Sequence, residues 1–122
     1  MKTVLIIDDQ PEIVDAVKDI LSLMDVRVLS APDGREGIRV YQEYKGTIDL
    51  ILLDLFLPDI SGQETLEALR ELNPIVKVVL SSGYGNAGNT LKQLGNVVGF
   101  LNKPFEMSQL MEVVSQHLSE NP

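Results

Sequence analysis

Short apolar runs alternate with amphipathic segments along this chain. Five runs rich in Val, Ile and Leu are each five or six residues long, and longer segments separate them. Such alternation is typical of βαβ units in a parallel sheet, and continuously apolar runs are typical of strands covered on both faces. The predicted strands are Thr3–Asp8, Val26–Ser30, Leu50–Asp54, Val76–Ser81 and Val97–Leu101.

Three of the intervening helices begin with recognisable signals. Pro11 starts the first helix, Asp33 is placed to cap the second, and Ser61 is placed to cap the third. Glu36 and Glu64 follow these two caps by three residues, as in a capping box. Apolar residues at helical spacing predict the last helix, and they are Met107, Leu110, Met111, Val114 and Leu118.

The helix between the fourth and fifth strands has the weakest pattern. Gly83, Gly85, Gly88 and Gly95 surround its leucines. Each glycine inside a helix costs about 1 kcal/mol relative to alanine. We expect this helix to be short and mobile.

The number of βα units restricts the topology. Right-handed crossovers allow few arrangements of five units, and the common open one has strand order 2-1-3-4-5. We therefore expect an α/β fold, a doubly wound, flavodoxin-like (βα)5 three-layer sandwich. The length of 122 residues fits a single domain over residues 1–122. Ligands of such sheets bind at the carboxyl ends of the strands where the order switches, here between the first and third strands.

Composition and charge narrow the possible partners. The net charge of −8 argues against a nucleic-acid or anionic-membrane surface, which leaves proteins and cations. The absence of cysteine excludes disulfides, thiolate metal sites and a cysteine nucleophile, and suits a reducing cytoplasm. No apolar run is long enough to span a bilayer.

Acidic residues follow the first and third predicted strands. Asp8 and Asp9 end the first apolar run and Asp54 ends the third, so all three are expected at the switch point. The other polar groups expected at this edge are Ser81 or Ser82 and Lys103. Without a counter-charge, at least one of three neighbouring carboxyl groups should have a raised pKa. An oxygen-only ligand set favours Mg²⁺ over Zn²⁺, and aspartate is a competent phosphoryl acceptor.

Each of these residues also has an ordinary structural explanation. Asp9 could cap the first helix with Glu12 as its partner, and Asp54 could be a turn residue. Ser82 could bond to the backbone at a strand end, and Lys103 could be a solvated surface lysine. Their convergence at one edge favours the functional interpretation.

Gly83, Gly85 and Gly88 raise an alternative from another functional class. They match the dinucleotide-binding pattern G-x-G-x-x-G and follow a strand. The pattern comes after the fourth strand, however, and leaves no room for a second mononucleotide-binding half. We interpret these glycines as loop residues. We also interpret His117 as a surface residue and Asp59 as a loop acid rather than a ligand.

Four separated motifs together resemble the receiver domain of two-component response regulators, over the whole chain. They are Asp8-Asp9, the run from Leu53 to Gly62, Ser81-Ser82-Gly83-Tyr84, and Lys103-Pro104-Phe105. The resemblance implies a domain that takes a phosphoryl group from a histidine kinase or a histidine phosphotransfer protein. It also implies Mg²⁺ as the cofactor.

The resemblance assigns roles to individual residues. It implies that Asp54 is the phosphoacceptor and that Asp8 and Asp9 hold Mg²⁺ with it. The backbone carbonyl of Phe56 would complete the metal sphere. Lys103 would contact the phosphoryl group.

Further roles follow from the same resemblance. The peptide bond into Pro104 would be cis. Ser82 matches the switch hydroxyl because it directly precedes the Gly83-Tyr84 pair, and Phe100 matches the switch aromatic. Family members often carry tyrosine or histidine at that last position, so switching through Phe100 must depend on packing.

Two aromatic residues suggest slow loss of the phosphoryl group. Phe56 lies two positions after Asp54, and Tyr84 lies two positions after Ser82. Both could overhang the path of attacking water. We therefore predict slow autodephosphorylation, and we predict that Phe56→Asn with Tyr84→Glu speeds it.

The resemblance also implies an output. Phosphorylation would switch the face formed by the fourth helix, fifth strand and fifth helix, with Leu91, Phe100 and Gln109 as contributors. That face could bind a downstream protein, a linked effector or a second copy of the chain. The chain would catalyse its own phosphorylation and dephosphorylation but act chiefly as a signalling switch. The alternative is a phosphorylation-independent interaction module of the same fold.

Overall fold

The computed structural model describes residues 1–83, 91 and 94–118. Five parallel strands form one sheet in the order β2-β1-β3-β4-β5, as predicted. The strands are β1 (Thr3–Ile7), β2 (Arg27–Ala31), β3 (Leu50–Asp54), β4 (Val78–Ser82) and β5 (Val97–Asn102). The helices in this part of the chain are α1 (Pro11–Ser22), α2 (Gly34–Glu43), α3 (Gly62–Leu72) and α4 (Met107–Leu118).

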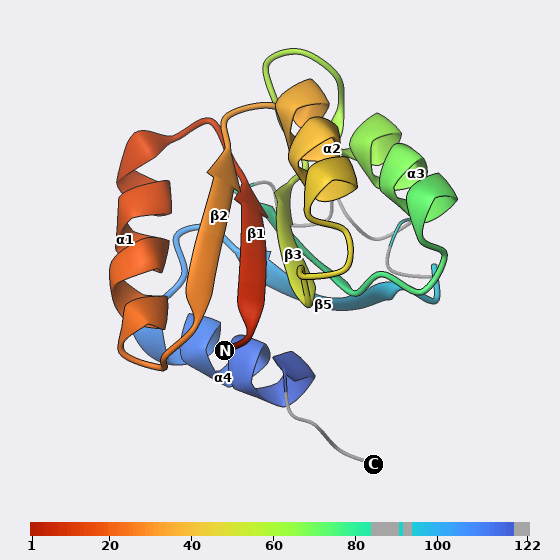
Figure 1. The fold of residues 1–122 in the computed structure, drawn as a ribbon. Coiled ribbons are helices and arrows are strands. Elements are labelled where there is room, and N and C mark those ends of the chain that lie inside the picture. The colour runs from red at the N-terminus through yellow and green to blue at the C-terminus, as the bar shows by residue number, and fades with distance from the viewer. Residues whose placement is uncertain (84–90, 92–93, 119–122) are drawn as a thin grey trace.

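The sheet is the middle of three layers (Figure 1). Alternate strand residues point to opposite faces, so Leu5 and Ile7 belong to a cluster with residues of α2 and α3. Val4 and Ile6 belong to a second cluster with residues of α1 and α4. Both faces of the sheet are covered, which explains why the strand sequences are continuously apolar. The predicted α/β sandwich fold is confirmed.

Several predicted strand limits were wrong by one or two residues. Val26 donates its N–H to the Leu21 carbonyl and so closes the turn after α1. Val76 donates in the same way to the Asn73 carbonyl. Val76 is nevertheless buried, which explains why its apolar character suggested a strand.

The helix starts agree in part with the predicted caps. The Asp33 carboxylate accepts the Glu36 N–H at 2.8 Å. The Glu36 carboxylate does not complete a capping box, because it pairs with Arg39 at 2.6 Å. At α3, Ser61 and Glu64 form the complete capping box.

The first helix has a different cap from the one considered for Asp9. Its N-cap is Gln10, which makes no side-chain capping hydrogen bond, and Pro11 is the first helical residue. Asp9 therefore lies one residue outside the helix, and its pairing with Glu12 as a capping box is wrong.

Gly62 brings α3 directly against the end of β3. A Cβ atom on Gly62 would lie 2.5 Å from the Leu55 Cα and 2.9 Å from the Asp54 carbonyl oxygen. Real Cβ atoms do not approach backbone this closely, so only glycine allows α3 to begin here. The loop from Leu55 to Ser61 is thereby fixed at both ends next to Asp54.

The predicted fourth helix falls mostly on residues 84–90 and 92–93, which lie outside the described residues. Leu91 is described and is buried. Among the described residues, no helix is both long and apolar enough to cross a membrane.

Candidate functional site

Strand register brings Asp8 and Asp54 together. Ile7 pairs with Leu53 across β1 and β3, so the next residues of the two segments, Asp8 and Asp54, come side by side. The alternation of side chains places Asp54 on the same sheet face as Leu52, the face that α1 and α4 cover. Both carboxylates are buried, with 3% and 5% of the residue exposed.

Lys103 joins the two buried carboxylates. Its Nζ lies 2.7 Å from Asp8 Oδ2 and 3.2 Å from Asp54 Oδ2, and its side chain is 11% exposed. Lys103 directly follows β5, whose last residue, Asn102, pairs with Ser82. The Lys103 N–H donates to the Ser82 carbonyl. Lys103 is therefore not the solvated surface lysine that was the structural alternative.

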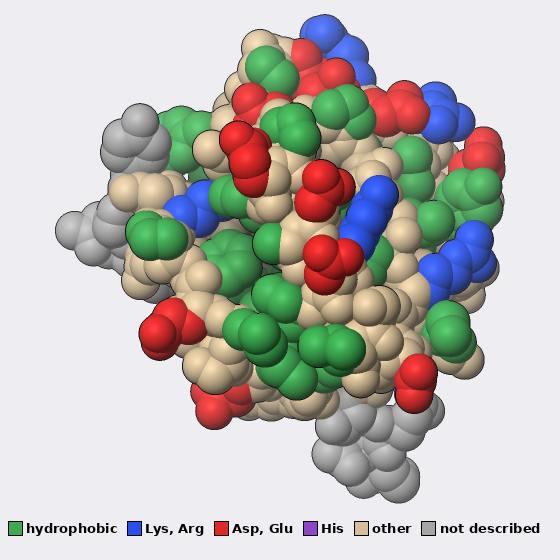
Figure 2. Space-filling view, turned by 90° about the vertical axis from the view of Figure 1, so that its left-hand side faces the viewer, with side chains coloured by type: hydrophobic (Ala, Val, Ile, Leu, Met, Phe, Trp, Pro, Cys, Tyr) green, Lys and Arg blue, Asp and Glu red, His purple; other side chains and the backbone are tan. Residues whose placement is uncertain are grey.

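Asp9 completes a cluster of three acids. One carboxylate oxygen from each of Asp8, Asp9 and Asp54 lies within 4.8 Å of the other two, and Asp9 is the exposed member. The cluster opens into a hollow of about 640 Å³ whose wall includes Asp9, Gln10, Asp54, Phe56, Lys103 and Pro104. Figure 2 views the molecule from the side of α1 and shows acidic and hydrophobic side chains interspersed on that side.

The pKa of Asp54 is raised above its ordinary value. Burial is the main cause, and the neighbouring Asp8 charge adds to it. The Phe56 N–H, which donates to Asp54 Oδ1 at 3.0 Å, and the Lys103 ammonium lower the pKa but do not cancel these effects. The predicted raised pKa of one carboxyl group is therefore present, but its main cause is burial: the Lys103 charge offsets the Asp8 charge and not the loss of hydration.

The donor set fits a hard divalent cation. Three carboxylates within 4.8 Å supply only oxygen ligands, and one face of the cluster is open to the hollow. Mg²⁺ is held by a few carboxylates and keeps open positions for water or phosphoryl oxygens. An added positive charge would also offset the desolvation of Asp54.

The two adjacent serines point to different faces of the sheet. By alternation, Ser81 shares a face with Val79 of the α1 and α4 cluster, whereas Ser82 shares a face with Leu80 of the other cluster. Phe100 packs against that same cluster and pairs with Leu80 in register. Ser82 and Phe100, the two proposed switch residues, thus lie on the α2 and α3 side.

The remaining predicted residues are placed as follows. Phe56 is 53% exposed on the wall of the hollow. The bond between Lys103 and Pro104 is cis, the isomer that the resemblance implied. Tyr84 lies outside the described residues. His117 is partly exposed on α4, in agreement with its interpretation as a surface residue.

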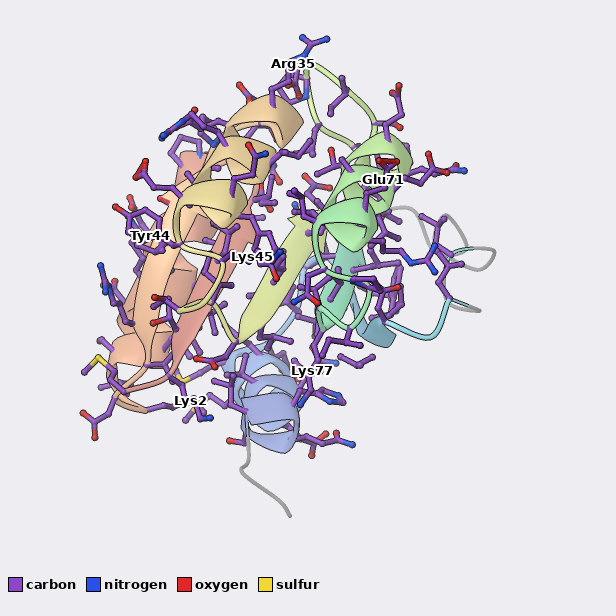
Figure 3. All side chains as sticks on the ribbon, turned by 45° about the vertical axis from the view of Figure 1, so that its right-hand side comes forward. Lys2, Arg35, Tyr44, Lys45, Glu71 and Lys77 are labelled. Atoms are coloured by element: carbon purple, nitrogen blue, oxygen red, sulfur yellow. The ribbon has the colours of Figure 1, made fainter. Side chains whose placement is uncertain are left out.

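The sequence did not predict the contacts of two residues, Gln10 at the site and Asp59 in the loop after β3. Gln10 accepts a hydrogen bond from Lys103 Nζ at 3.0 Å through its side-chain oxygen. Asp59 accepts the Gly34 and Arg35 N–H groups, at 2.8 and 2.9 Å, and so caps α2 from the loop after β3. Figure 3 shows Arg35 at the start of α2, beside that loop.

We expect Asp59→Ala to destabilise the protein at pH 7 by about 0.5–1 kcal/mol, as for the loss of an exposed helix cap. Partial desolvation opposes ionisation, but the Arg35 and Gly34 N–H groups outweigh it and lower the pKa of Asp59 from 3.8 to about 2. A lowered folded-state pKa gives stability that is complete above pH 3.8 and lost as pH falls through about 2.

Urea unfolding of the wild type and Asp59→Ala between pH 2 and 7 measures this difference. The gap should close as pH falls below 4, in the window set by a pKa that moves from 3.8 to about 2. Asp15→Ala, at an exposed position of α1, is the control and should show little loss at pH 7. A constant gap across the range would contradict the role of the Asp59 charge.

Comparison with known sequences identifies relatives over most of the chain. A profile of the family described as "Response regulator receiver domain" matches residues 4–115. An uncharacterized transcriptional regulatory protein of Bacillus subtilis, YcbL, is 31% identical over 87% of this chain, which spans 46% of that protein. The chemotaxis protein CheY of Thermotoga maritima is 26% identical over 94% of this chain and 96% of its own length.

Solved structures agree with this relation. A response regulator receiver domain protein of Clostridium thermocellum has a TM-score of 0.88 and 26% identity, covering 97% of this chain and 94% of that one. The response regulator TrrA of Thermotoga maritima, solved in complex with Mg²⁺-BeF, has a TM-score of 0.82 and 27% identity, covering 97% and 100%. With the profile match over residues 4–115, these likenesses show that the chain belongs to the response regulator receiver domain family.

Proposed function

We propose that this chain takes a phosphoryl group from a phosphohistidine of a histidine kinase or phosphotransfer protein onto the Asp54 carboxylate. The observation that carries the proposal is the position of Lys103. Its ammonium bonds both Asp8 and Asp54 at the floor of an open hollow. A buried carboxylate held by a cation and accessible from one side is the arrangement that an acceptor needs.

In the proposed reaction, an Asp54 oxygen attacks the phosphorus. The new O–P bond forms as the N–P bond of the phosphohistidine breaks, and the electron pair of that bond returns to the imidazole. Lys103 offsets the negative charge of the phosphoryl oxygens, and the Phe56 N–H holds Asp54 in place through Oδ1.

Mg²⁺ would be held by Asp8, Asp9 and Asp54, with the Phe56 carbonyl as a further ligand. When bound, it would neutralise charge shared between the acceptor and the phosphoryl oxygens. Support comes from the oxygen cluster within 4.8 Å and from the Mg²⁺-BeF complex of the related TrrA.

We propose that phosphorylation is read at the face built from β5, α4 and the segment between β4 and β5. Ser82 ends β4 and Phe100 lies within β5, the two strands that lead to this face. Gln109 is exposed on α4, whereas Leu91 is buried and would contribute through packing beneath the face. A downstream protein, a linked effector or a second copy of the chain would bind there. We place the reaction in the cytoplasm, which suits a cysteine-free chain.

Incubation with acetyl phosphate and Mg²⁺, followed by intact mass measurement, tests the proposal. We expect the wild type to gain one phosphoryl group, and Asp54→Asn to gain none. Asp15→Asn, at an exposed site on α1, is the matched control and should be modified like the wild type. No gain with several small donors would favour an interaction module that works without phosphorylation.

We expect Phe56→Asn to speed loss of the phosphoryl group by about tenfold, a change of roughly 1.4 kcal/mol in the barrier. Phe56 is 53% exposed and lines the same hollow as Asp54, so we propose that its ring narrows the approach of water. The mass of the phosphorylated protein, followed in time after removal of the donor, measures the rate. Adding Tyr84→Glu should speed the loss further, and unchanged decay in both variants would refute the aromatic-cover hypothesis.

A further inference from the structure

The side chain of Gln10 lines the site but has no role in the proposed reaction. It is the N-cap of α1, but its side chain makes no capping hydrogen bond. Instead, its Oε1 accepts from Lys103 Nζ at 3.0 Å, across 93 positions of sequence. Its backbone N–H donates to Asp8 Oδ1 at 2.9 Å. Gln10 therefore touches both the ammonium and the carboxylate that the ammonium binds.

The Lys103 ammonium has three N–H donors, and three acceptors surround it. They are Asp8 Oδ2 at 2.7 Å, Gln10 Oε1 at 3.0 Å and Asp54 Oδ2 at 3.2 Å. Two of these acceptors are carboxylates whose charge must be shared with a cation or a phosphoryl group during the proposed reaction. The Gln10 amide is neutral, and it would bind neither the cation nor the phosphoryl group.

This difference gives the amide a separate role. When Asp8 and Asp54 turn toward other partners, their bonds to Lys103 weaken, and the long lysine side chain regains rotamer freedom. The Gln10 amide oxygen is not a carboxylate that the reaction recruits, so its bond to Lys103 can remain while those two bonds weaken. It keeps the ammonium, on a side chain that is 11% exposed, at the acceptor carboxylate.

We infer that Gln10 is a positioning residue: its amide oxygen holds the Lys103 ammonium at Asp54 and thereby sets the rate at which Asp54 is phosphorylated. This inference rests on the proposed function. Gln10 acts through Lys103 and does not itself touch the phosphoryl group. Its contribution should therefore disappear when Lys103 is absent.

Gln10→Met keeps the length of the side chain and removes the amide oxygen. We expect the rate constant for phosphorylation by saturating acetyl phosphate to fall about fivefold, the scale of losing one hydrogen bond. The acetyl phosphate concentration giving half-maximal rate and the melting temperature should change little. Gln10→Glu restores an acceptor oxygen at this position and should keep Lys103 in place, though its charge repels the donor and raises that half-maximal concentration.

A double-mutant cycle tests whether Gln10 works through Lys103. In the Lys103→Ala background, adding Gln10→Met should leave the phosphorylation rate unchanged. Gln42→Met, an exposed glutamine on α2, is the control and should match the wild type. Intact mass at timed intervals gives all the rates.

The possible failures can be told apart. No phosphorylation of the wild type would overturn the proposed function itself. A normal wild type with an equally fast Gln10→Met would overturn only the role of Gln10. A Gln10→Met effect that persists in Lys103→Ala would also overturn it, because the residue would then act independently of Lys103.

Discussion

Lys103→Met should destabilise the protein at neutral pH. The ammonium is bonded to two carboxylates that are 3% and 5% exposed, and Met leaves them facing each other without a counter-charge. Removing one partner of a buried ion pair costs about 3–5 kcal/mol, and we expect about 2 kcal/mol here because the cluster borders an open hollow. Acid should narrow the difference, since protonation removes the repulsion between the carboxylates.

The same substitution should tighten Mg²⁺ binding. Lys103 and the cation compete for Asp8 and Asp54, so loss of the ammonium removes both a competitor and a repelling charge. Phosphorylation, in contrast, should slow by about 100-fold, the scale for losing a charged group that stabilises a transition state. The variant would thus bind the cation more strongly and react more slowly.

Three measurements on one pair of proteins check this expectation. Urea unfolding gives the stability, calorimetric titration gives the Mg²⁺ affinity, and intact mass with acetyl phosphate gives the rate. Lys45→Met is the matched control, because Lys45 is exposed in the turn after α2 (Figure 3). Weaker Mg²⁺ binding in Lys103→Met would contradict the competition that the geometry implies.

The main features of the site could be predicted because they depend on topology. Asp8 and Asp54 end two apolar runs, and the order 2-1-3-4-5 makes those runs neighbours. Parallel strands then bring their carboxyl ends to one edge, whatever the details of packing. Lys103 reaches the same edge because β5 runs parallel to the others.

The errors in the predicted helix cap and strand limit arose where the residue type fits two local structures. Glu36 could answer the Asp33 cap or pair with Arg39 on the next turn, and the ion pair at 2.6 Å prevails. Val76 is buried although it lies in the turn before β4, and an apolar pattern cannot distinguish a buried turn residue from a strand residue. Both choices depend on local geometry that residue type alone does not encode.

Gln10 and Asp59 could not have been found from local patterns. Gln10 meets Lys103 across 93 positions, and Asp59 meets Gly34 across 25. Neither contact follows from strand alternation or helix periodicity, because both residues lie outside the regular elements. Their partners become neighbours only when the loops at the edge of the sheet are in place.

The raised pKa of Asp54 leads to a second large expected effect: Asp54→Asn, which lacks the acceptor carboxylate, should be more stable than the wild type. Burial and the Asp8 charge make ionised Asp54 unfavourable in the folded state. Asn keeps the shape and an acceptor for the Phe56 N–H but carries no charge. We expect Asp54→Asn to gain on the order of 1 kcal/mol at pH 7 without Mg²⁺, within what replacing buried charges yields.

The pH dependence follows from the sign of the shift. Because the folded-state pKa of Asp54 is raised, its contribution to stability is complete below the ordinary value of 3.8 and is lost as pH rises through the folded pKa. Asn does not titrate, so the advantage of Asp54→Asn should shrink on acidification toward pH 3.8. Mg²⁺ should also shrink it at pH 7, since a cation that binds the three carboxylates stabilises the wild type more.

Thermal unfolding of both proteins from pH 3 to 8, with and without Mg²⁺, measures these changes. Asp15→Asn, an exposed acid on α1, is the control and should follow the wild type. An Asp54→Asn protein less stable than the wild type at pH 7 without Mg²⁺ would mean that the Lys103 bond outweighs desolvation. The folded protein would then not oppose the ionisation of Asp54, and the electrostatic reason for a cation at this edge of the sheet would be lost.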